Sequence, residues 1–463
     1  MSHRSSSRCA HSSLSFSPSS NAKRVGYKPL TLQQRVTATT SSGFINPKAK
    51  EKLSTVDDAT FPAPLVLPDD ELSLDPKYPP QSFRSWFHGN YRNKIPPERA
   101  GDKGRLERRT IYLAAPPEFS PDVAFARTWA QPIAKKTKGS EKVKVDIQDV
   151  LDYLKAFYHG LTVKLLPSIP IFTKDVDCMM IDSPEKEQSE SEVLWLDTKT
   201  KSGCIGIRSR ARPKGEYSHQ LNLNDLLDAA IQILPEDAYA IVMLLDHDIY
   251  EDEEDDFACG RAYGGSRVSV ISSARYNPVL DQKQEIEREH GWPASHCERY
   301  MIWWVDEVDI EETGAIKKGE NAQESGLAGK RMTPMQAALA AHNSLPSLAR
   351  SNPSAASLSA LWLARVCRTT AHELGHCFGM DHCVYYACSM QGTASIIEDA
   401  RQPPYLCPID LAKVLCATGA DVKERYRALL QFCERKSEGQ VFKAYGAWIK
   451  ARLAEIEGAE TVS

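Results

Sequence analysis

Hydrophobic residues in the first half of the chain recur at helical spacing in two segments. The first segment covers residues 146–158, and its apolar positions are Ile147, Val150, Leu151, Leu154 and Phe157. Positions spaced in this way lie on one side of a helix. The second segment covers residues 224–234. We expect Asn224 to cap its N-terminus, because an asparagine oxygen readily accepts a backbone N–H there.

Short apolar runs around these helices predict strands, at 110–114, 161–166, 204–207, 238–245 and 267–274. The run 238–245 is almost continuously apolar, as in a strand that is buried on both faces. The run 267–274 alternates serine with apolar residues, which predicts a strand near a sheet edge where an extended peptide could pair. Helices that alternate with strands predict an α/β (α+β) fold with a mixed, mostly parallel sheet.

The N-terminus and one internal segment lack these patterns. Residues 1–50 contain no Asp or Glu and are rich in Ser, Thr, Arg and Lys, which predicts a disordered tail. An organellar transit peptide has a similar composition and is the alternative. Residues 311–357 are rich in Gly, Ala, Ser and Glu, and we interpret them as a surface insertion with at most a short helix over 335–341.

Composition narrows the class of protein further. The formal net charge of −4 over 463 residues gives no indication of nucleic-acid binding. No run of about 18 apolar residues predicts a membrane span, and no secretory signal is evident. Five of the 12 cysteines lie between Cys377 and Cys416, and such clustering in a reducing compartment indicates metal binding. We expect a cytoplasmic or nuclear protein, with mitochondrial targeting by the acid-free N-terminus as the alternative.

The run His372-Glu373-Leu374-Gly375-His376 carries the strongest chemical signal, within a helix predicted from about 355 to 378. His372 and His376 are four residues apart, so both imidazoles project from one face and can bind one ion. Glu373 stands beside them in the position of a general base. The run alone also occurs by chance in helices that bind no metal.

Two residues beyond this helix make the signal far more specific. Gly379 can adopt a left-handed conformation, end the helix and turn the chain, so that His382 returns to the ion. Three histidines leave a fourth position open for water, as a catalytic zinc site requires. The sequence therefore predicts a zinc ion bound by His372, His376 and His382.

The residues that follow extend this motif. Cys383 comes directly after His382, then come Cys388 and Met390, and Cys407 follows after a gap of sixteen residues. With the preceding histidines, this pattern resembles the archaemetzincin family, and the resemblance covers about residues 110–435. It implies a metzincin-like catalytic domain with an active-site helix and C-terminal helices. It also implies that Met390 lies beneath the histidines as the Met-turn residue, and that a second, structural zinc ion is bound by Cys383, Cys388 and Cys407.

The fourth ligand of that second site departs from the family pattern, because Asp410 stands where a cysteine is expected. Asp410 could bind zinc through a carboxylate oxygen. A water molecule, another residue, Cys377 or Cys416 could complete the site instead. Asp410 also has an explanation without metal. If Cys407 caps a helix that begins at Pro408, an acid in the first turn favours the helix dipole.

We expect four parts in the chain: a tail at 1–50, an extension at 51–109 that packs on the domain, a zinc peptidase domain at 110–440, and a C-terminal helix and tail at 441–463. The predicted activity is hydrolysis of peptide or protein substrates, with Glu373 as the base. The resemblance implies an aminopeptidase-like preference for short peptides. The alternative is a zinc-stabilised binding module with little activity, although the intact Glu373 argues against it. Cys9 and His11 are too isolated in the sequence to predict a metal site.

Overall fold

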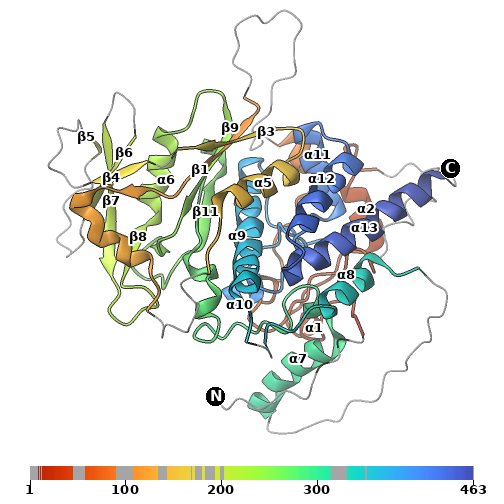
Figure 1. The fold of residues 1–463 in the computed structure, drawn as a ribbon. Helices are drawn as coiled ribbons and strands as arrows, with labels where there is room; N and C mark the ends of the chain where they lie inside the picture. Colours follow the sequence, from red (N-terminus) through yellow and green to blue (C-terminus); the bar gives the residue numbers. More distant parts are fainter. Residues whose placement is uncertain are drawn as a thin grey trace, which may run out of the picture.

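The computed structural model describes residues 9, 11, 13–44, 58–89, 108–133, 143–167, 169–172, 180–182, 193–198, 203–313, 331–349 and 352–461. Its β-sheets lie on one side of the long helix α9 (Ala355–Cys377), and the C-terminal helices lie on the other (Figure 1). This arrangement confirms the predicted α/β class.

A five-stranded sheet packs directly against α9. Its order is β11-β12-β9-β1-β3, and every neighbouring pair is parallel except β11 with β12. The strands are β1 (Thr110–Ala114), β3 (Thr162–Leu166), β9 (Ala238–Leu245), β11 (Gly260–Tyr263) and β12 (Val268–Ser272). The predicted strands at 110–114, 161–166 and 238–245 are thus confirmed, as is the mixed, mostly parallel sheet.

Strand β12 lies next to the edge strand of its sheet, in agreement with the strand near an edge that its alternating pattern predicts, but both of its own edges are paired. It pairs with β9 on one side and with β11 on the other, and all five of its residues are buried. Its serines are hydrogen-bonded inside the protein, Ser272 to the carbonyl of His247 at 2.6 Å and Ser269 to that of Ile241 at 3.4 Å. The polar positions therefore mark internal hydrogen bonds, and the edge of the sheet is the short strand β11.

Both faces of this sheet are covered. Ile111, Leu113, Val242 and Leu244 pack with α9 and α5 (Ile147–Phe157), whereas Tyr112, Ile241 and Met243 pack on the opposite side with α6 (Leu223–Gln232). Because successive side chains of a strand point to opposite faces, a strand buried on both faces is apolar throughout. This explains the continuous apolar run of β9.

A second sheet lies beyond α6, so the predicted strand at 204–207 does not belong to the main sheet. Its order is β10-β8-β7-β6-β4-β2, and β5 pairs with β7. The strands are β2 (Glu118–Phe119), β4 (Pro170–Phe172), β5 (Met180–Asp182), β6 (Val193–Asp197), β7 (Cys204–Ala211), β8 (His219–Asn222) and β10 (Ile249–Tyr250). Hydrophobic spacing along one strand carries no information on which sheet it joins.

The helix start predicted at Asn224 lies two residues too late. Asn222 caps α6, and its side chain accepts the backbone N–H of Asp225 at 3.1 Å. Asn224 instead donates to the carbonyl of Glu251 and accepts the hydroxyl of Tyr263. Either asparagine satisfies a capping preference, and tertiary contacts decide between them.

Four helices follow the α9 turn: α10 (Ile396–Asp399), α11 (Pro408–Thr418), α12 (Val422–Arg435) and α13 (Gln440–Thr461). Helices α12 and α13 pack on each other, and α12 also packs on α5 (Figure 1). No helix in the described parts of the chain is long and apolar enough to cross a membrane.

Residues 13–44 do not form the disordered tail predicted for 1–50. They contain α1 (Asn21–Arg24) and α2 (Leu32–Ala38), and the latter begins with a capping box of Thr31 and Gln34. A few apolar side chains suffice to anchor this polar segment, because the large domain supplies the surface against which they pack. The hydroxyl of Tyr27, for example, donates to the carbonyl of Val384 at 3.0 Å. Residues 1–8 and 45–50 lie outside the described part.

The extension that follows contains α3 (Glu71–Leu74) and α4 (Phe83–His88), and α4 contacts α11.

The predicted insertion at 311–357 follows α7 (Glu298–Thr313) and contains α8 (Pro334–Asn343), which packs closely along α13. Met335 and Ala338 on α8 are fully buried, so this part is core rather than surface. Residues 314–330 and 350–351 lie outside the description.

Candidate metal centres

Helix α9 brings the first two histidines together. Ser354 caps its N-terminus and no proline interrupts its 23 residues, so His372 and His376 lie one turn apart on one face. Their Nε2 atoms are 3.1 Å apart. Two nitrogens that bind one tetrahedral zinc ion at about 2.0–2.1 Å lie roughly 3.3–3.4 Å apart. The pair is therefore spaced for one shared ion.

The turn after the helix adds the third histidine. Gly379 has φ of +74°, a left-handed conformation that ends helices, and its N–H donates to the carbonyl of His376. The chain then reverses, and the ring centroid of His382 comes to lie 5.3 Å from His372 and 5.1 Å from His376. Ring nitrogens of all three residues lie within 4.8 Å of one another.

Backbone carbonyls hold two of these rings in place. Nδ1 of His372 lies 2.8 Å from the carbonyl of Ser389, and Nδ1 of His376 lies 2.7 Å from that of Met380. A carbonyl only accepts, so the proton sits on Nδ1 and the Nε2 lone pair is free for a metal. His382 packs against Gly392, where an added Cβ would stand 2.5 Å from Nδ1.

The chemistry of these side chains fits zinc. Burial lowers the pKa of His372, of His376 and of His382, the last to about 4. The imidazoles are therefore neutral at physiological pH, which metal binding requires. The structure thus brings together the three predicted ligands in the form that a zinc ion accepts.

Glu373 and the histidines line one cleft of about 810 Å³. Strand β11 borders it, and Cγ of Glu373 lies 3.4 Å from the position that a Cβ on Gly260 would take. Burial raises the pKa of Glu373 to about 8, against the opposing charges of Arg261 and Arg368. Its carboxyl therefore takes up a proton more readily than an exposed glutamate does.

Met390 lies under the histidine helix. A Cβ added to Gly375, which neighbours His376, would overlap Sδ of Met390, and Met390 is 1% exposed. The carbonyl of Met390 also accepts the N–H of Cys383 at 2.7 Å, which joins this residue to the start of the cysteine cluster. Its position agrees with the Met-turn role that the resemblance implies, and that role stays a prediction.

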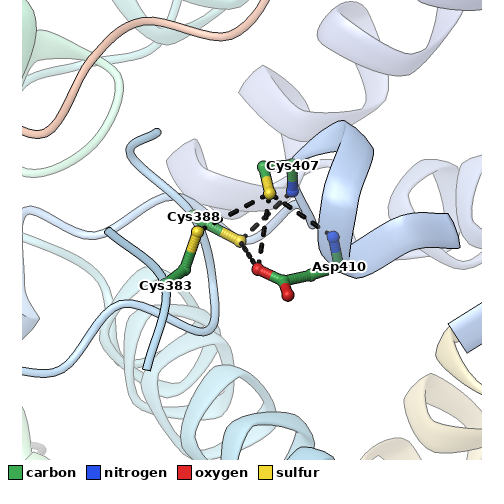
Figure 2. A group of neighbouring side chains, drawn as sticks. All are labelled: Cys383, Cys388, Cys407 and Asp410. Atoms are coloured by element: carbon green, nitrogen blue, oxygen red, sulfur yellow. Dashed lines mark hydrogen bonds between the residues drawn. The ribbon is translucent and has the colours of Figure 1, made fainter. Parts of the chain in front are cut away.

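Cys383, Cys388, Cys407 and Asp410 form a second, fully buried cluster, in which all four side chains point toward one another (Figure 2). The Sγ atoms of Cys383 and Cys407 are 3.6 Å apart. Oδ2 of Asp410 lies 3.4 Å from Sγ of Cys388 and 3.3 Å from Sγ of Cys407. Burial opposes ionisation of Cys383, but hydrogen bonds from Cys388 and Cys407 outweigh it and lower its pKa.

The position of Asp410 is compatible with both explanations given above, a zinc ligand and a first-turn acid, and the ligand role stays a prediction. Cys407 caps α11, Pro408 is the first helical residue, and Asp410 lies in the first turn. The same carboxylate also completes the four-residue cluster. Its second oxygen, Oδ1, accepts from Nζ of Lys413 at 2.8 Å, and both side chains are 1% exposed. Three thiolates and a carboxylate leave a net negative charge even around a divalent cation, and Lys413 offsets part of it.

The other cysteines considered for the fourth position lie elsewhere. Cys416 is exposed, and Cys377 hydrogen-bonds with Ser269 of β12. Tyr385 and Tyr386 are buried in the main core and do not line the cleft, which agrees with a packing role.

Sequence reasoning missed several residues that surround these sites. Nε2 of Gln81 donates to the carbonyl of Gly379 and to Asp381, while its Oε1 accepts from Lys413. Tyr78 lies against the ring of His382, with centroids 5.7 Å apart. Lys413 had a local signal, since it stands three residues after Asp410 on one helix face. Gln81 and Tyr78 had none, because their partners lie some 300 residues away in the chain.

This chain is similar to one protein family and to several known proteins. The family model described as peptidase family M54 matches residues 347–414. Archaemetzincin-2 of Macaca fascicularis and of Homo sapiens are each 23% identical, over 84% of this chain and 79% and 78% of their own lengths. Archaemetzincin-1 of Homo sapiens is 24% identical over 76% of this chain and 49% of its own length. A solved archaemetzincin from Methanopyrus kandleri aligns over 66% of this chain and 94% of its own, with 15% identity and a TM-score of 0.30.

Proposed function

We propose that this chain, which belongs to the archaemetzincin family of zinc metallopeptidases, hydrolyses peptide bonds with Glu373 as its general base. The observation that carries the proposal is one cleft lined by Glu373 and by three neutral, converging histidines. A zinc ion bound there would supply Lewis-acid chemistry, by polarising the scissile carbonyl and lowering the pKa of water to roughly 7.

The residues of the chain have separate roles in the reaction. His372, His376 and His382 would hold the ion, and the carbonyls of Ser389 and Met380 fix the orientation of the first two rings. Glu373 takes a proton from the attacking water. It returns that proton to the leaving amine nitrogen as the C–N bond breaks.

Strand β11 offers a place for the substrate backbone. It is the last strand of its sheet among the described residues and it borders the cleft. An extended peptide that pairs with a sheet edge gains main-chain hydrogen bonds without regard to its sequence. We therefore propose β11, in place of the 267–274 strand expected from the sequence, as the surface that aligns the scissile bond with Glu373.

The proposal is tested with the Glu373→Gln variant in the zinc-loaded full chain. Loss of the base is expected to reduce kcat by about 10²- to 10⁴-fold on a pooled peptide library, with zinc content unchanged. Glu457→Gln alters an exposed glutamate of α13 and serves as the matched control. Equal cleavage by wild type and Glu373→Gln contradicts the proposed base. No cleavage by zinc-loaded wild type favours the binding-module alternative.

We further propose an aminopeptidase-like preference for short peptides, by analogy with the family. It is tested by comparing peptides with a free N-terminus and the same peptides after N-terminal acetylation. A preference of at least tenfold in kcat/KM for the free amine supports it. Equal cleavage of both forms, or cleavage only within longer peptides, shows endopeptidase activity instead.

A further inference from the structure

A third group of cysteines and histidines lies outside both sites described above. Donor atoms of Cys9, His11 and His290 lie within 4.8 Å of one another. Sγ of Cys297 is 3.3 Å from Sγ of Cys9. No sequence pattern pairs Cys9 and His11 with residues 290–297, and the fold brings them together.

Backbone contacts hold the N-terminal segment against this region. Leu14 forms an antiparallel bridge with Cys297. The N–H of Ser15 donates to the carbonyl of His296 at 2.8 Å, and the N–H of Glu298 donates to that of Ser13 at 3.2 Å. The cluster therefore joins the start of the described chain to the 3-10 helix Ala294–His296 and to the start of α7.

The histidines of this group are held as metal ligands usually are. Nδ1 of His290 lies 2.8 Å and 2.9 Å from the two carboxylate oxygens of Glu287. Its ring stacks on Tyr300, with centroids 4.1 Å apart. The remaining nitrogen, Nε2, is buried, and the ring lies beside the thiol of Cys9. A second residue that orients one ring nitrogen leaves the other available to an ion.

His11 and Cys9 supply the other donors. Nδ1 of His11 lies 3.1 Å from Oδ1 of Asn343, which again engages one ring nitrogen.

We propose that Cys9, His11, His290 and Cys297 form a third zinc site, which fastens the N-terminal segment to the residues that precede α7. Two cysteines and two histidines are a donor set that zinc favours. The position is half-buried, since Cys9 is partly exposed and His290 is 5% exposed.

A disulfide between Cys9 and Cys297 is the competing explanation. Two sulfurs on one tetrahedral zinc ion at about 2.3 Å lie roughly 3.8 Å apart, whereas a disulfide needs about 2.05 Å. The separation of 3.3 Å is nearer to the first value, and the structure holds both cysteines as free thiols.

The test is the zinc content of the full chain, measured by elemental analysis after dialysis. The double variant Cys9→Ala/His11→Ala is expected to hold one zinc per chain less than wild type. Cys416→Ala, which removes an exposed cysteine outside the cluster, is expected to hold as much as wild type. Substituting the N-terminal pair spares the buried Cys297. Should that double variant be insoluble, His11→Gln alone is titrated with a chelator and is expected to release one zinc per chain more readily than wild type.

Cobalt substitution identifies the ligands. The difference between the absorption spectra of Co(II)-loaded wild type and double variant is expected to contain thiolate-to-cobalt charge transfer. Equal metal content in both proteins overturns the proposal. So does a Cys9–Cys297 disulfide found by peptide mapping of the freshly purified, metal-replete protein. None of these measurements uses peptide cleavage, so an inactive wild type would contradict the proposed function and leave this test intact.

Discussion

Lys413 and Gln81 are hydrogen-bonded to each other, with Nζ of the lysine 2.9 Å from Oε1 of the glutamine. Lys413 also pairs with Asp410 in the cysteine cluster, and Gln81 also holds the turn that carries His382. One pair of side chains therefore connects the two candidate metal centres, in addition to the backbone between His382 and Cys383.

Replacing Gln81 with alanine is expected to weaken zinc binding by the histidines. The carbonyl of Gly379 and the carboxylate of Asp381 lose their donor, so the turn that presents His382 is held less firmly. Loss of such an orienting residue typically costs 10- to 100-fold in metal affinity. A chelator titration of the full chain measures the change. Gln232→Ala, at an exposed position of α6, is the control, and equal chelator midpoints for both variants would refute the connection.

Two substitutions distinguish the contribution of Asp410 to zinc binding from that of Lys413. Asp410→Ala is expected to remove about one zinc per chain, and to destabilise the fold by roughly 3–5 kcal/mol since it leaves a buried ammonium unpaired. Lys413→Met removes the cation but keeps the carboxylate, so zinc content is expected to stay at the wild-type value. Zinc content and chemical denaturation check both. Full zinc in a destabilised Asp410→Ala protein would make Asp410 an ion-pair partner only.

Gly375→Ala tests the contact between the histidine helix and Met390. The added methyl group would overlap Sδ of Met390 and approach Cε of Met380 in a packed core. Overpacking of this kind costs about 1–3 kcal/mol. The double variant Gly375→Ala/Met390→Ala makes room, so its loss is expected to be smaller than the sum of the single losses.

The control for that prediction is Gly458→Ala on α13, where an added Cβ meets nothing within 4 Å. Alanine in a helix is expected to stabilise by about 0.5–1 kcal/mol relative to glycine. Additive losses in the Gly375 and Met390 pair, measured by denaturant unfolding, would show that the two residues do not press on each other.

Glu398 is expected to make stability fall as pH rises. Burial raises its pKa from 4.5 to about 8, with Asp70 adding to the effect. The folded protein therefore holds this proton more tightly than the unfolded chain. The stabilisation is complete below pH 4.5 and is lost as pH rises to about 8, with a slope of at most about 1.4 kcal/mol per pH unit.

Glu398→Gln removes this titration, and its amide oxygen can still accept the N–H groups of Glu71 and Ala394. Relative to wild type, the variant is expected to gain stability between pH 5.5 and pH 8.5. Denaturant unfolding in excess zinc measures the difference, with Glu457→Gln as the control. If the stability difference between Glu398→Gln and wild type does not vary with pH, the raised pKa of Glu398 does not contribute to folding stability.

The catalytic motif could be predicted from sequence because its logic is local. His372, Glu373 and His376 belong to one helix, and Gly379 ends it, so periodicity and spacing specify their arrangement. The cluster of Cys383, Cys388 and Cys407 could be predicted because cysteines crowd in this part of the sequence and because the pattern resembles a known family.

What sequence could not predict depends on distant partners. The serines of β12 alternate with apolar residues as in a strand near a sheet edge, and only the neighbouring strands show that both edges of β12 are paired. The segment 13–44 has the composition of a disordered tail, yet it folds because the domain offers a surface to a few apolar side chains. His290 and Cys297 became candidate ligands only when the fold placed Cys9 and His11 beside them.

The contact between Gln81 and Gly379 also has a consequence for synthesis. The two residues are 298 positions apart in the chain. Because ribosomes add about 5–20 residues per second, Gly379 is synthesised roughly 15–60 s after Gln81. The extension that carries Gln81 cannot complete its packing during that interval. The turn that presents His382 is therefore completed only in the last part of synthesis, after Gly379 has been added.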